Sequence, residues 1–462
     1  QKEITHVVQV GERSGEPVEI INSKQWYIKY LDKKKTFLDA AKKLKWHPEH
    51  MKTKLDNWIK GLQWDWSISR QRHFGVPIPA WHCKNCGETI FAEEKQLPID
   101  PLKDKPLKAC GKCKSKEFIP EKDVFDTWFT SASSPFLAIT LMPKEIRGKL
   151  FPMSLRPQAH DIINFWLFYT MAKTQLLESK NPWENVTISG WALDSKGEKM
   201  SKSKGNVIEP QAVVEKFGAD AIRYWAASSK LGEDISYQEK EILSGKKLAN
   251  KIINASNFVF MNMKDYKPKK TNLLETDRIF LVMLNETIEK TTKNWDNYEY
   301  HIGRLETDNF FWQIFCNNYL EIVKKRVYSG TKEEKESAFY VLYNSLLTLL
   351  KLYAPITPFV AEEIYQKYFR KNEDEKSIHI SSWPEIFSVK KKKDDGEIFE
   401  LLMKTITNVR QEKSVAKKAM NAEIILTLDK KDSGKLKLFL EDLKSVMNAK
   451  EIKEGKFSVE FL

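Results

Sequence analysis

The sequence predicts an α/β protein in its first half, a helical bundle in its second half and a small α/β appendage at its end. Three observations indicate this order. Short β-branched runs alternate with helical spacing in the first half, and apolar residues recur at helical spacing from about Glu239 to Tyr368. Strand and helix patterns alternate again over residues 397–462. With 462 residues, of which 41% are hydrophobic, the chain is long enough for about three domains with buried cores.

The charge balance points to an acidic partner. The formal net charge is +13, and nucleic acid is the usual partner of so basic a protein, although a lysine-rich surface can also serve solubility alone. The opening QKEITHVVQV lacks the basic and apolar regions of a signal peptide, and no apolar run approaches the roughly 20 residues that span a bilayer. Four of the cysteines pair as C-x2-C motifs, which indicates metal binding in a reducing compartment rather than disulfides, so we expect a cytoplasmic location.

The first part of the chain mixes strand and helix patterns. HVVQV and PVEII are predicted strands with GERSGE as the turn between them, and Thr36–Trp58 has apolar residues near helical spacing. The segment WDWSISRQR (Trp64–Arg72) is a predicted strand that ends in a polar turn. Its SRQ side chains either line a site or cap the strand end, and the residues alone do not decide between the two.

Four of the five cysteines form a metal-binding pattern. Cys83 and Cys86 make one C-x2-C pair, and Cys110 and Cys113 make another. Two such turns offer four thiolates to one tetrahedral ion, which predicts a structural zinc ribbon, with iron as the alternative metal. Cys316 lies on an apolar helical face and is predicted to be core.

Two motifs precede a predicted apolar helix over roughly Ile162–Leu177. These are VFDTWFTSA (Val124–Ala132) and RPQAHDIINFW (Arg156–Trp166). Asp161 stands where this helix starts, so its carboxylate either caps free N–H groups or faces a ligand. The aromatic residues of both motifs either form a pocket or belong to the core.

The octapeptide KMSKSKGN (Lys199–Asn206) is the most informative stretch. Three lysines separated by serines and followed by a glycine suit a mobile loop that closes over a polyphosphate. Lysine is a compact charge on a flexible stem, and backbone N–H groups left open by serine and glycine can approach phosphate oxygens. The alternative is a solvated basic turn.

The rest of the chain is predicted to be mainly helical. In FGADAIRYW, Asp220 and Arg223 are spaced to form a local ion pair or to contact RNA. APITPF (Ala354–Phe359) breaks one bundle helix and starts the next. Residues 390–396 are predicted to be a solvated linker.

The C-terminal appendage is predicted to contain a helix through Arg410, a strand at Glu423–Leu428, a helix at Lys435–Ala449 and a final strand. Its basic residues are candidates for phosphate contacts, which add affinity without reading sequence. The candidates are Arg410, Lys413, Lys417 and Lys418.

These motifs together resemble the class I aminoacyl-tRNA synthetases, and within them the valyl enzymes of archaeal type. The resemblance rests on KMSKSKGN, WSISRQ, DTWF, HDII and FFWQIFCNNYLEIVKKR, and it extends over nearly the whole chain. It implies the second half of a Rossmann-like catalytic domain with an inserted four-cysteine zinc ribbon, then an α-helical anticodon-binding bundle and a small α/β C-terminal appendage.

The resemblance implies seven segments. They are 1–62, the end of an editing insertion and return to the catalytic domain; 63–82, a catalytic strand and active-site edge; 83–118, the zinc ribbon; 119–189, the rest of the Rossmann half-domain; 190–238, the KMSKS loop and connecting helices; 239–389, the anticodon-binding domain; and 390–462, the C-terminal domain.

The resemblance also implies site residues. ATP, with Mg, would be bound by His160, Asp161, Lys199, Met200, Ser201, Lys202 and Ser203. Lys199 and Lys202 would be catalytic, because they stabilise the triphosphate during attack by the amino acid carboxylate. The amino acid pocket would be formed by Trp128, Asp161, Ile162 and Trp166. The isoleucyl enzyme has Gln where Ile162 stands, so this residue favours valine.

The implied reaction is activation of valine to valyl-adenylate and transfer to tRNA(Val). We expect this chain to lack the first ATP motif and most of the editing domain, and to form adenylate only with an N-terminal half of the same synthetase. Two alternatives remain at this stage: a non-catalytic tRNA-binding protein derived from a synthetase, and an isoleucine-tRNA ligase. A trimmed chain and one piece of a split enzyme both fit this expectation.

Overall fold

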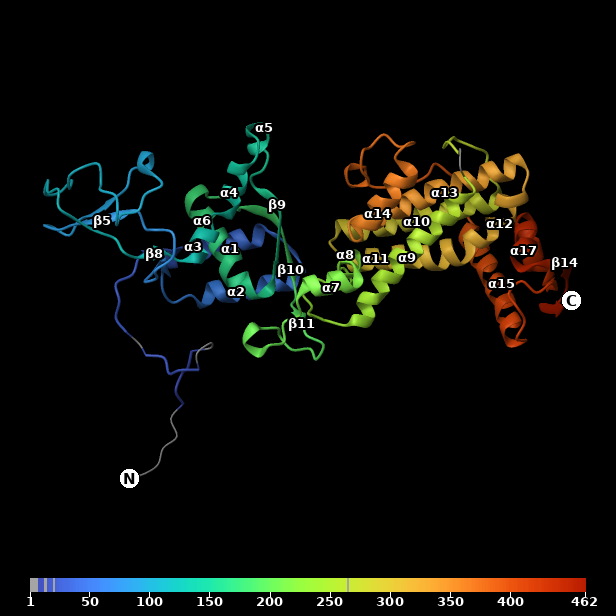
Figure 1. Cartoon of the computed structure of the whole chain (residues 1–462), viewed down its shortest axis with the longest axis horizontal. Helices are drawn as coiled ribbons and strands as arrows, with labels where there is room; N and C mark the ends of the chain where they lie inside the picture. The colour runs from blue at the N-terminus through green and yellow to red at the C-terminus, as the bar shows by residue number, and fades with distance from the viewer. Residues whose placement is uncertain (1–6, 12–14, 20, 264–265) are drawn as a thin grey trace, which may run out of the picture. The chain divides into compact units, whose positions relative to one another are not determined.

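The computed structural model describes residues 7–11, 15–19, 21–263 and 266–462, and its chain path is drawn in Figure 1. The described residues form two compact units. The first unit comprises the residues up to Leu193 together with Lys199–Val207 and Leu231–Asp234. The second unit comprises Asp194–Glu198, Ile208–Lys230 and Ile235–Leu462. Within the described ranges, no helix has both the length and the apolar character needed to cross a membrane.

The first unit mixes short strands and helices. Its strands are β1 (Tyr27–Ile28), β2 (Lys45–His47), β3 (Trp66–Ser67), β4 (Ser69–Arg70), β5 (Ala80–Cys83), β6 (Thr89–Phe91), β7 (Phe118–Pro120), β8 (Val124–Phe125), β9 (Met153–Ala159), β10 (Trp183–Ser189) and β11 (Ala192–Leu193). Its α-helices are α1 (Lys34–Lys43), α2 (Lys52–Gly61), α3 (Thr127–Ser131), α4 (Ser134–Leu141), α5 (Lys144–Arg147) and α6 (Phe168–Glu178).

A parallel three-stranded sheet lies at the centre of the first unit. Its order is β2-β10-β9, and Val186 of β10 pairs with Trp46 on one side and Arg156 on the other. Val186 and Ile188 of the central strand are completely buried. Val186 and Ile188 point to one face of the sheet and Thr187, which is 9% exposed, points to the other, so both faces are covered there, as is typical of a parallel strand flanked by helices.

Aromatic packing joins the helices α1 and α6 to each other. Phe37 of α1 and Phe168 of α6 are both fully buried, and their rings meet edge to face with centroids 5.7 Å apart. In α1 the residues Phe37, Ala40 and Ala41 are buried, at the i, i+3, i+4 spacing of one helix face. The predicted helical spacing of Thr36–Trp58 is therefore real, but β2 separates it into two helices, α1 and α2.

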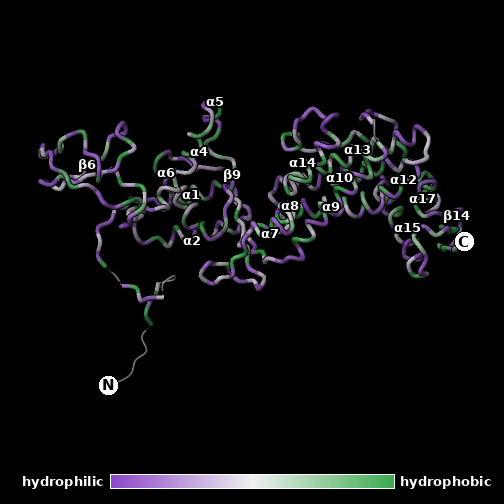
Figure 2. Tube along the Cα trace, viewed as in Figure 1, coloured by the Kyte–Doolittle hydropathy of each residue, from purple (hydrophilic) through white to green (hydrophobic). Residues whose placement is uncertain are grey.

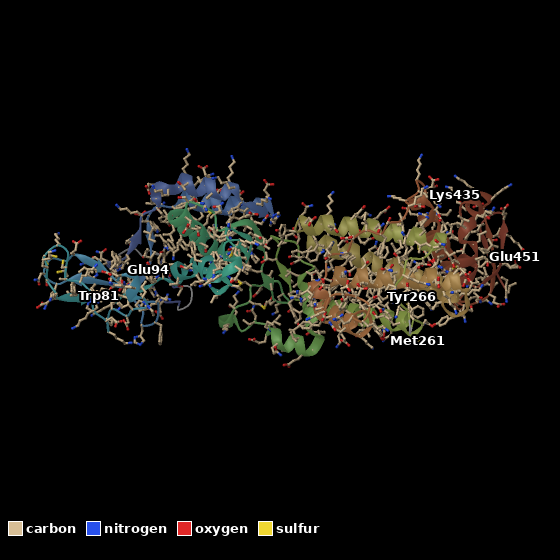
Figure 3. The ribbon with its side chains drawn as sticks, turned by 90° about the horizontal axis from the view of Figure 1, so that it is seen from above. Trp81, Glu94, Met261, Tyr266, Lys435 and Glu451 are labelled. Carbon is tan, nitrogen blue, oxygen red and sulfur yellow. The ribbon has the colours of Figure 1, made fainter. Side chains whose placement is uncertain are left out.

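The four-cysteine segment forms an antiparallel sheet of its own, with the order β6-β5-β7. Trp81 of β5 is 2% exposed, and its indole Nε1 donates hydrogen bonds to Pro101 O and Asp104 O. Figure 3 labels Trp81 and the neighbouring Glu94 in this ribbon. The strands extend from Ala80 to Pro120, slightly beyond the expected segment 83–118.

The expected opening strands are not formed in the described residues. HVVQV and PVEII contribute only an isolated bridge between Val10 and Pro17. His6 and Ile20 of these stretches lie outside the described residues.

The second unit is mainly helical. Its α-helices are α7 (Pro210–Phe217), α8 (Ala219–Ala226), α9 (Glu239–Met261), α10 (Glu275–Asp296), α11 (Tyr300–Asn309), α12 (Leu320–Ser329), α13 (Lys332–Tyr353), α14 (Pro358–Ile364), α15 (Asp395–Val415), α16 (Lys430–Lys435) and α17 (Leu440–Met447). Its strands are β12 (Ile235–Ser236), β13 (Ile424–Leu428), β14 (Ala449–Glu454) and β15 (Ser458–Phe461).

One apolar core runs through the bundle of the second unit. It includes Leu248 of α9, Leu284 of α10 and Leu346 of α13, each completely buried. Figure 2 shows hydrophobic residues along these helices. The proline-containing turn ends α13 at Tyr353 and α14 begins at Pro358, as predicted, because proline is tolerated in the first turn of a helix but not in its interior.

The C-terminal appendage has three strands in the order β14-β13-β15, so one strand more than predicted. β13 is parallel to β14 and antiparallel to β15. The predicted linker 390–396 is wrong at its end, because Asp395 is completely buried and starts α15. The carboxylate of Asp395 binds the guanidinium of Arg278, with Nη1 to Oδ2 at 2.8 Å.

Candidate functional site

The lysine loop has a defined turn. Ser201 precedes a 3-10 turn over Lys202–Lys204, and its Oγ accepts a hydrogen bond from Lys204 N at 3.3 Å. Gly205 follows with φ 66°, a left-handed conformation that glycine adopts without strain. Lys202 is exposed, and nothing is described of the side chain of Ser203. The pattern of serine, lysine and glycine thus forms one capped turn in which Lys202 is exposed to solvent.

Asn206 closes this loop from its other end. Its Nδ2 donates to Lys199 O at 3.2 Å, and its Oδ1 accepts from Ser201 N at 2.9 Å. Both bonds go to backbone atoms, so they fix the path of the loop rather than any one lysine side chain. Sequence reasoning gave Asn206 no role, although an asparagine after a glycine is a common turn signal.

Lys199 lies at the start of the loop and rests on an aromatic ring. Leu193 and Lys199 form an isolated antiparallel bridge. The Nζ of Lys199 lies 4.1 Å from the ring centroid of Trp191, which is a cation–π contact. The ring of Trp191 in turn lies 4.6 Å from the ring of His160. The structure therefore brings two of the predicted ATP residues, His160 and Lys199, into contact with the same tryptophan.

His160 and Trp191 meet because two parallel strands end together. Ala159 at the end of β9 pairs with Ser189 at the end of β10, so the residues that follow leave the sheet at the same edge. The carboxyl edge of parallel strands is where α/β folds bind ligands. Asp161 is exposed there, and the backbone O of His160 accepts a hydrogen bond from Lys54 Nζ at 2.8 Å.

The predicted apolar helix begins irregularly at this edge. A 3-10 turn over His160–Ile162 is followed by a π-helical turn over Ile163–Leu167 and then by α6. Neither turn has a side-chain cap, so the capping alternative for Asp161 is not supported. Single π-turns inside α-helices are frequent at functional sites. Here Phe168 N donates five residues back, to Ile163 O.

An aromatic group stands beside this π-turn. Trp128 of α3 stacks on Phe165, with centroids 5.3 Å apart and planes 16° apart. Trp58 of α2 adds a tilted contact to Phe165 at 6.4 Å. Sequence reasoning missed Phe165 because the π-turn changes which residues share a face, and it missed Trp58 because α2 is far from this turn in the sequence. The only available signal was the aromatic pair Phe165-Trp166 itself.

Trp166 is fixed by polar contacts with the neighbouring turn. Its Nε1 lies 3.3 Å from both Ser131 O and Ser134 Oγ, to which it donates. Trp128 and Ser131 both belong to α3, so α3 and the π-turn together hold the two predicted tryptophans. Arg156 of β9 packs its guanidinium against Trp166 and lies 4.7 Å from the ring centroid of Trp183.

The four cysteines form a candidate metal centre. Their Sγ atoms all lie within 4.8 Å of one another, with Cys83 and Cys113 3.4 Å apart and Cys86 and Cys110 3.6 Å apart. Four thiolates at Zn–S bonds of about 2.3 Å would lie somewhat under 4 Å from each other, so the donor set fits one tetrahedral ion. Because four protein ligands complete the shell, such a centre would stabilise the ribbon and leave no position for a substrate.

Comparison with known families agrees with both units. The model of class I tRNA synthetases (I, L, M and V) matches residues 10–238, and the model of the anticodon-binding domain of tRNA ligases matches residues 277–426. The chain belongs to the class I aminoacyl-tRNA synthetases. Helices α11 to α15 of this synthetase chain lie within the second match, and α10 begins two residues before it.

The curated relatives of this chain include valine–tRNA ligases. The chain is 42% identical to the valine–tRNA ligase of Rickettsia conorii, over 98% of this chain and 57% of that protein. It is 39% identical to the valine–tRNA ligase of Thermoplasma acidophilum, over 92% of this chain and 54% of that protein. The chain therefore spans little more than half the length of these relatives.

Solved structures agree on the fold. A leucyl-tRNA synthetase of Agrobacterium radiobacter K84, in a ternary complex with tRNA and LeuAMS, matches with a TM-score of 0.56 and 20% identity, covering 86% of this chain and 51% of that chain. A methionyl-tRNA synthetase of Mycobacterium tuberculosis, with methionyl-adenylate, matches with a TM-score of 0.56 and 19% identity, covering 77% of this chain and 65% of that chain.

The predicted local ion pair between Asp220 and Arg223 in the synthetase's helical unit needs correction. Asp220 caps α14, where its carboxylate accepts from Val360 N at 2.8 Å and Phe359 N at 3.2 Å. Arg223 donates to Ile356 O and Pro355 O. Both side chains therefore bind the proline-containing turn rather than each other. They hold α8 against the turn that precedes α14.

Two of the predicted phosphate contacts in the appendage are also engaged inside the unit. Lys413 is 1% exposed, and its Nζ donates to Met420 O, Ala422 O and Met447 O. Arg410 donates to Asn318 Oδ1 at 2.9 Å. A lysine with three carbonyl acceptors closes the end of α15 and has no donor left for phosphate. Lys417 and Lys418 remain exposed.

Proposed function

We propose that this chain forms part of a valine–tRNA ligase, which activates valine with ATP and Mg and transfers it to tRNA(Val). The observation that carries the proposal is the identity of 42% to a valine–tRNA ligase over 98% of the chain. Because the chain spans 57% of that relative, we infer that activity requires an N-terminal half in addition. We propose that the protein acts in the cytoplasm.

The proposed ATP site is the carboxyl edge of β9 and β10 with the lysine loop. Lys199 and Lys202 would neutralise charge that develops on the triphosphate when the valine carboxylate attacks the α-phosphate. Charge fixed in place before the reaction stabilises the transition state more than the ground state. Met200, Ser201 and Ser203 would supply backbone and hydroxyl contacts, and His160 and Asp161 would face the adenylate.

The proposed valine pocket lies between α3 and the π-turn. Trp128, Ile162 and Trp166 would surround the side chain of valine, and Asp161 would bind its amino group. The stacking of Phe165 on Trp128 supports a rigid wall. An apolar pocket of this kind excludes isoleucine by bulk but rejects the isosteric threonine only weakly.

The four-cysteine centre would hold a structural zinc ion. When bound, zinc supplies four bonds that fix the two turns of the ribbon, and it takes no part in the reaction. The second unit would bind tRNA, in line with the match to anticodon-binding domains over residues 277–426.

The test is valine-dependent ATP–pyrophosphate exchange. The chain is mixed with a separately expressed N-terminal part of the R. conorii enzyme that ends where the chain begins to match. We expect exchange with valine, much weaker exchange with isoleucine, and none from the chain alone. Exchange driven best by isoleucine, or no exchange from any mixture while both parts are folded, would contradict the proposal.

A lysine variant tests the proposed chemistry. Lys202→Met should lower the exchange rate about 100- to 1000-fold, the range seen when one preorganised transition-state donor is removed. Lys196→Met is the matched control, because Lys196 is an exposed lysine just before the loop. An equal loss in both variants would show that Lys202 has no special role.

A further inference from the structure

A short segment that follows α8 belongs to the first unit rather than the second. Leu231–Asp234 packs with the sheet of the first unit, while the residues on both sides of it belong to the second. Gly232 N donates to Ile188 O of β10 at 2.7 Å. We call Leu231–Asp234 the strap. The hydrogen bond from Gly232 N fixes the strap to the end of the central strand β10.

Two glycines let the strap approach this closely. A Cβ on Gly190 would lie 2.1 Å from Glu233 O, so the backbones touch with no room for a side chain. Gly232 has φ +85°, and a Cβ there would lie 2.8 Å from Pro48 Cγ. Close approach and a positive φ are the two conditions that require glycine. The strap therefore occupies one defined position beside Gly190 and Trp191.

The position of the strap places one carboxylate oxygen between two elements of the proposed ATP site. Asp234 Oδ1 accepts a hydrogen bond from Trp191 N at 2.7 Å. The same oxygen lies 3.3 Å from His160 Nε2, which donates to it when that nitrogen carries the proton. Asp234 thus joins the residue after β9 to the segment after β10.

These contacts continue to the lysine loop. The rings of His160 and Trp191 are 4.6 Å apart, and the Nζ of Lys199 lies 4.1 Å from the Trp191 ring. The orientation of the indole depends on its own backbone and on the imidazole beside it. Asp234 binds both, so it acts on Lys199 through Trp191.

We propose that Asp234 is a positioning residue for the lysine loop: it holds Trp191 and His160 so that the indole face fixes Lys199 at the start of the loop. The inference rests on the proposed function, since it assigns the loop to ATP. It adds a residue from outside every motif that predicted the site. A structural clamp with no effect on the loop is the competing explanation.

Limited proteolysis of the chain alone separates these explanations. Trypsin cleaves after lysine, so cleavage after Lys199, Lys202 and Lys204 reports release of the loop. Asp234→Ala should speed this cleavage about tenfold or more, the effect expected from losing a hydrogen bond to a charged group. Asp234→Asn keeps an oxygen acceptor for Trp191 N–H and should restore cleavage to near the original rate.

Kinetics in the reconstituted mixture give the second readout. Asp234→Ala should lower kcat/KM for ATP about 10- to 100-fold with less than a twofold change in KM for valine. Glu178→Ala, which removes an exposed carboxylate of the first unit, should leave both unchanged. Equal effects on ATP and valine would indicate general damage to the fold and overturn the inference, as would an unchanged loop cleavage rate.

A failure of the proposed function is recognised separately. If the unsubstituted mixture shows no exchange, the proposed function is contradicted, and the proteolysis still decides whether Asp234 controls the loop. If Asp234→Ala fails to fold by circular dichroism, Trp191→Leu replaces it. That variant keeps the backbone bond to Asp234 but removes the ring, and the inference requires that it release the loop. If the loop of Trp191→Leu were still protected from trypsin, the inference would be overturned.

Discussion

Asp277 and Arg326 form a buried ion pair inside the helical unit, with Arg326 Nη1 2.6 Å from Asp277 Oδ2. Asp277 is completely buried, and its Oδ1 also accepts from Tyr319 OH at 2.6 Å. Arg326 makes a second ion pair with Asp442 of α17 at 3.0 Å. One guanidinium therefore joins α10 and α12 of the bundle to a helix of the C-terminal appendage.

Removing the acid from this pair should destabilise the helical unit strongly. Asp277→Ala leaves Arg326 buried with fewer acceptors, which typically costs about 3–5 kcal/mol of the free energy of unfolding. The measurement is urea unfolding followed by far-UV circular dichroism. Glu289→Ala, an exposed acid on the same helix, is the control and should change stability by less than about 0.5 kcal/mol. Similar midpoints for the two variants would show that the pair contributes little.

Metal removal should unfold the ribbon without unfolding the bundle. The ribbon is small, and the four Sγ atoms of its two C-x2-C turns all lie within 4.8 Å of one another. Structural zinc sites contribute folding free energy directly. We expect one zinc per chain by elemental analysis, and a chelator should expose the Cys83 and Cys110 thiols to a thiol reagent. A chain that binds iron instead, or that keeps these thiols protected without metal, would contradict this prediction.

Local patterns predicted much of the fold because they reflect local physics. The i, i+3, i+4 spacing of Phe37, Ala40 and Ala41, the two C-x2-C turns and the proline-containing turn before Pro358 each act within a few residues. The contacts of Asp395 could not be predicted in this way. Its charge and its lysine neighbours suggest a solvated linker, and only the distant Arg278 makes it a buried helix start.

In the candidate site, too, residues in contiguous motifs could be predicted, whereas residues that depend on distant contacts could not. The lysine loop and the tryptophans of α3 and the π-turn were identified from contiguous motifs that resemble a family. Asp234 and Phe165 were missed for different reasons. Asp234 belongs to the strap, which is separated in sequence from the lysine loop, and it contacts the site through Trp191. Phe165 lies in a π-turn, which changes the direction of its side chain. A π-turn changes the side-chain period, so helical spacing could not assign Phe165 to the same wall as Trp128.

Lys173 should make the stability of the first unit pH-dependent. Its Nζ donates to Ser133 Oγ at 2.6 Å and lies 3.9 Å from the ring of Phe129, and burial lowers the pKa of Lys173 from 10.5 to about 8. Between these pH values the unfolded chain binds the proton and the folded chain does not. The free energy of unfolding should therefore rise with pH across this window.

The variant Lys173→Met isolates this contribution. It keeps an apolar chain of similar length and carries no titrating group. Urea unfolding of both proteins across the window should show the original chain gaining stability relative to the variant, with a constant difference below about pH 8. A difference that stays constant through the window would show that Lys173 keeps its proton in the folded chain.

Asn206 should control the lysine loop from its far end. Its side chain joins Lys199 O and Ser201 N, so Asn206→Ala removes both bonds and frees the loop. Two lost hydrogen bonds on an exposed loop correspond to about 1–3 kcal/mol, and we expect trypsin cleavage within the loop to rise about 5- to 100-fold. Asn206→Asp keeps the acceptor for Ser201 N and loses the donor to Lys199 O, so its cleavage rate should be intermediate. If the alanine and aspartate variants were cleaved equally fast, the Ser201 bond would contribute nothing, and any protection by Asn206 would come from its bond to Lys199 O.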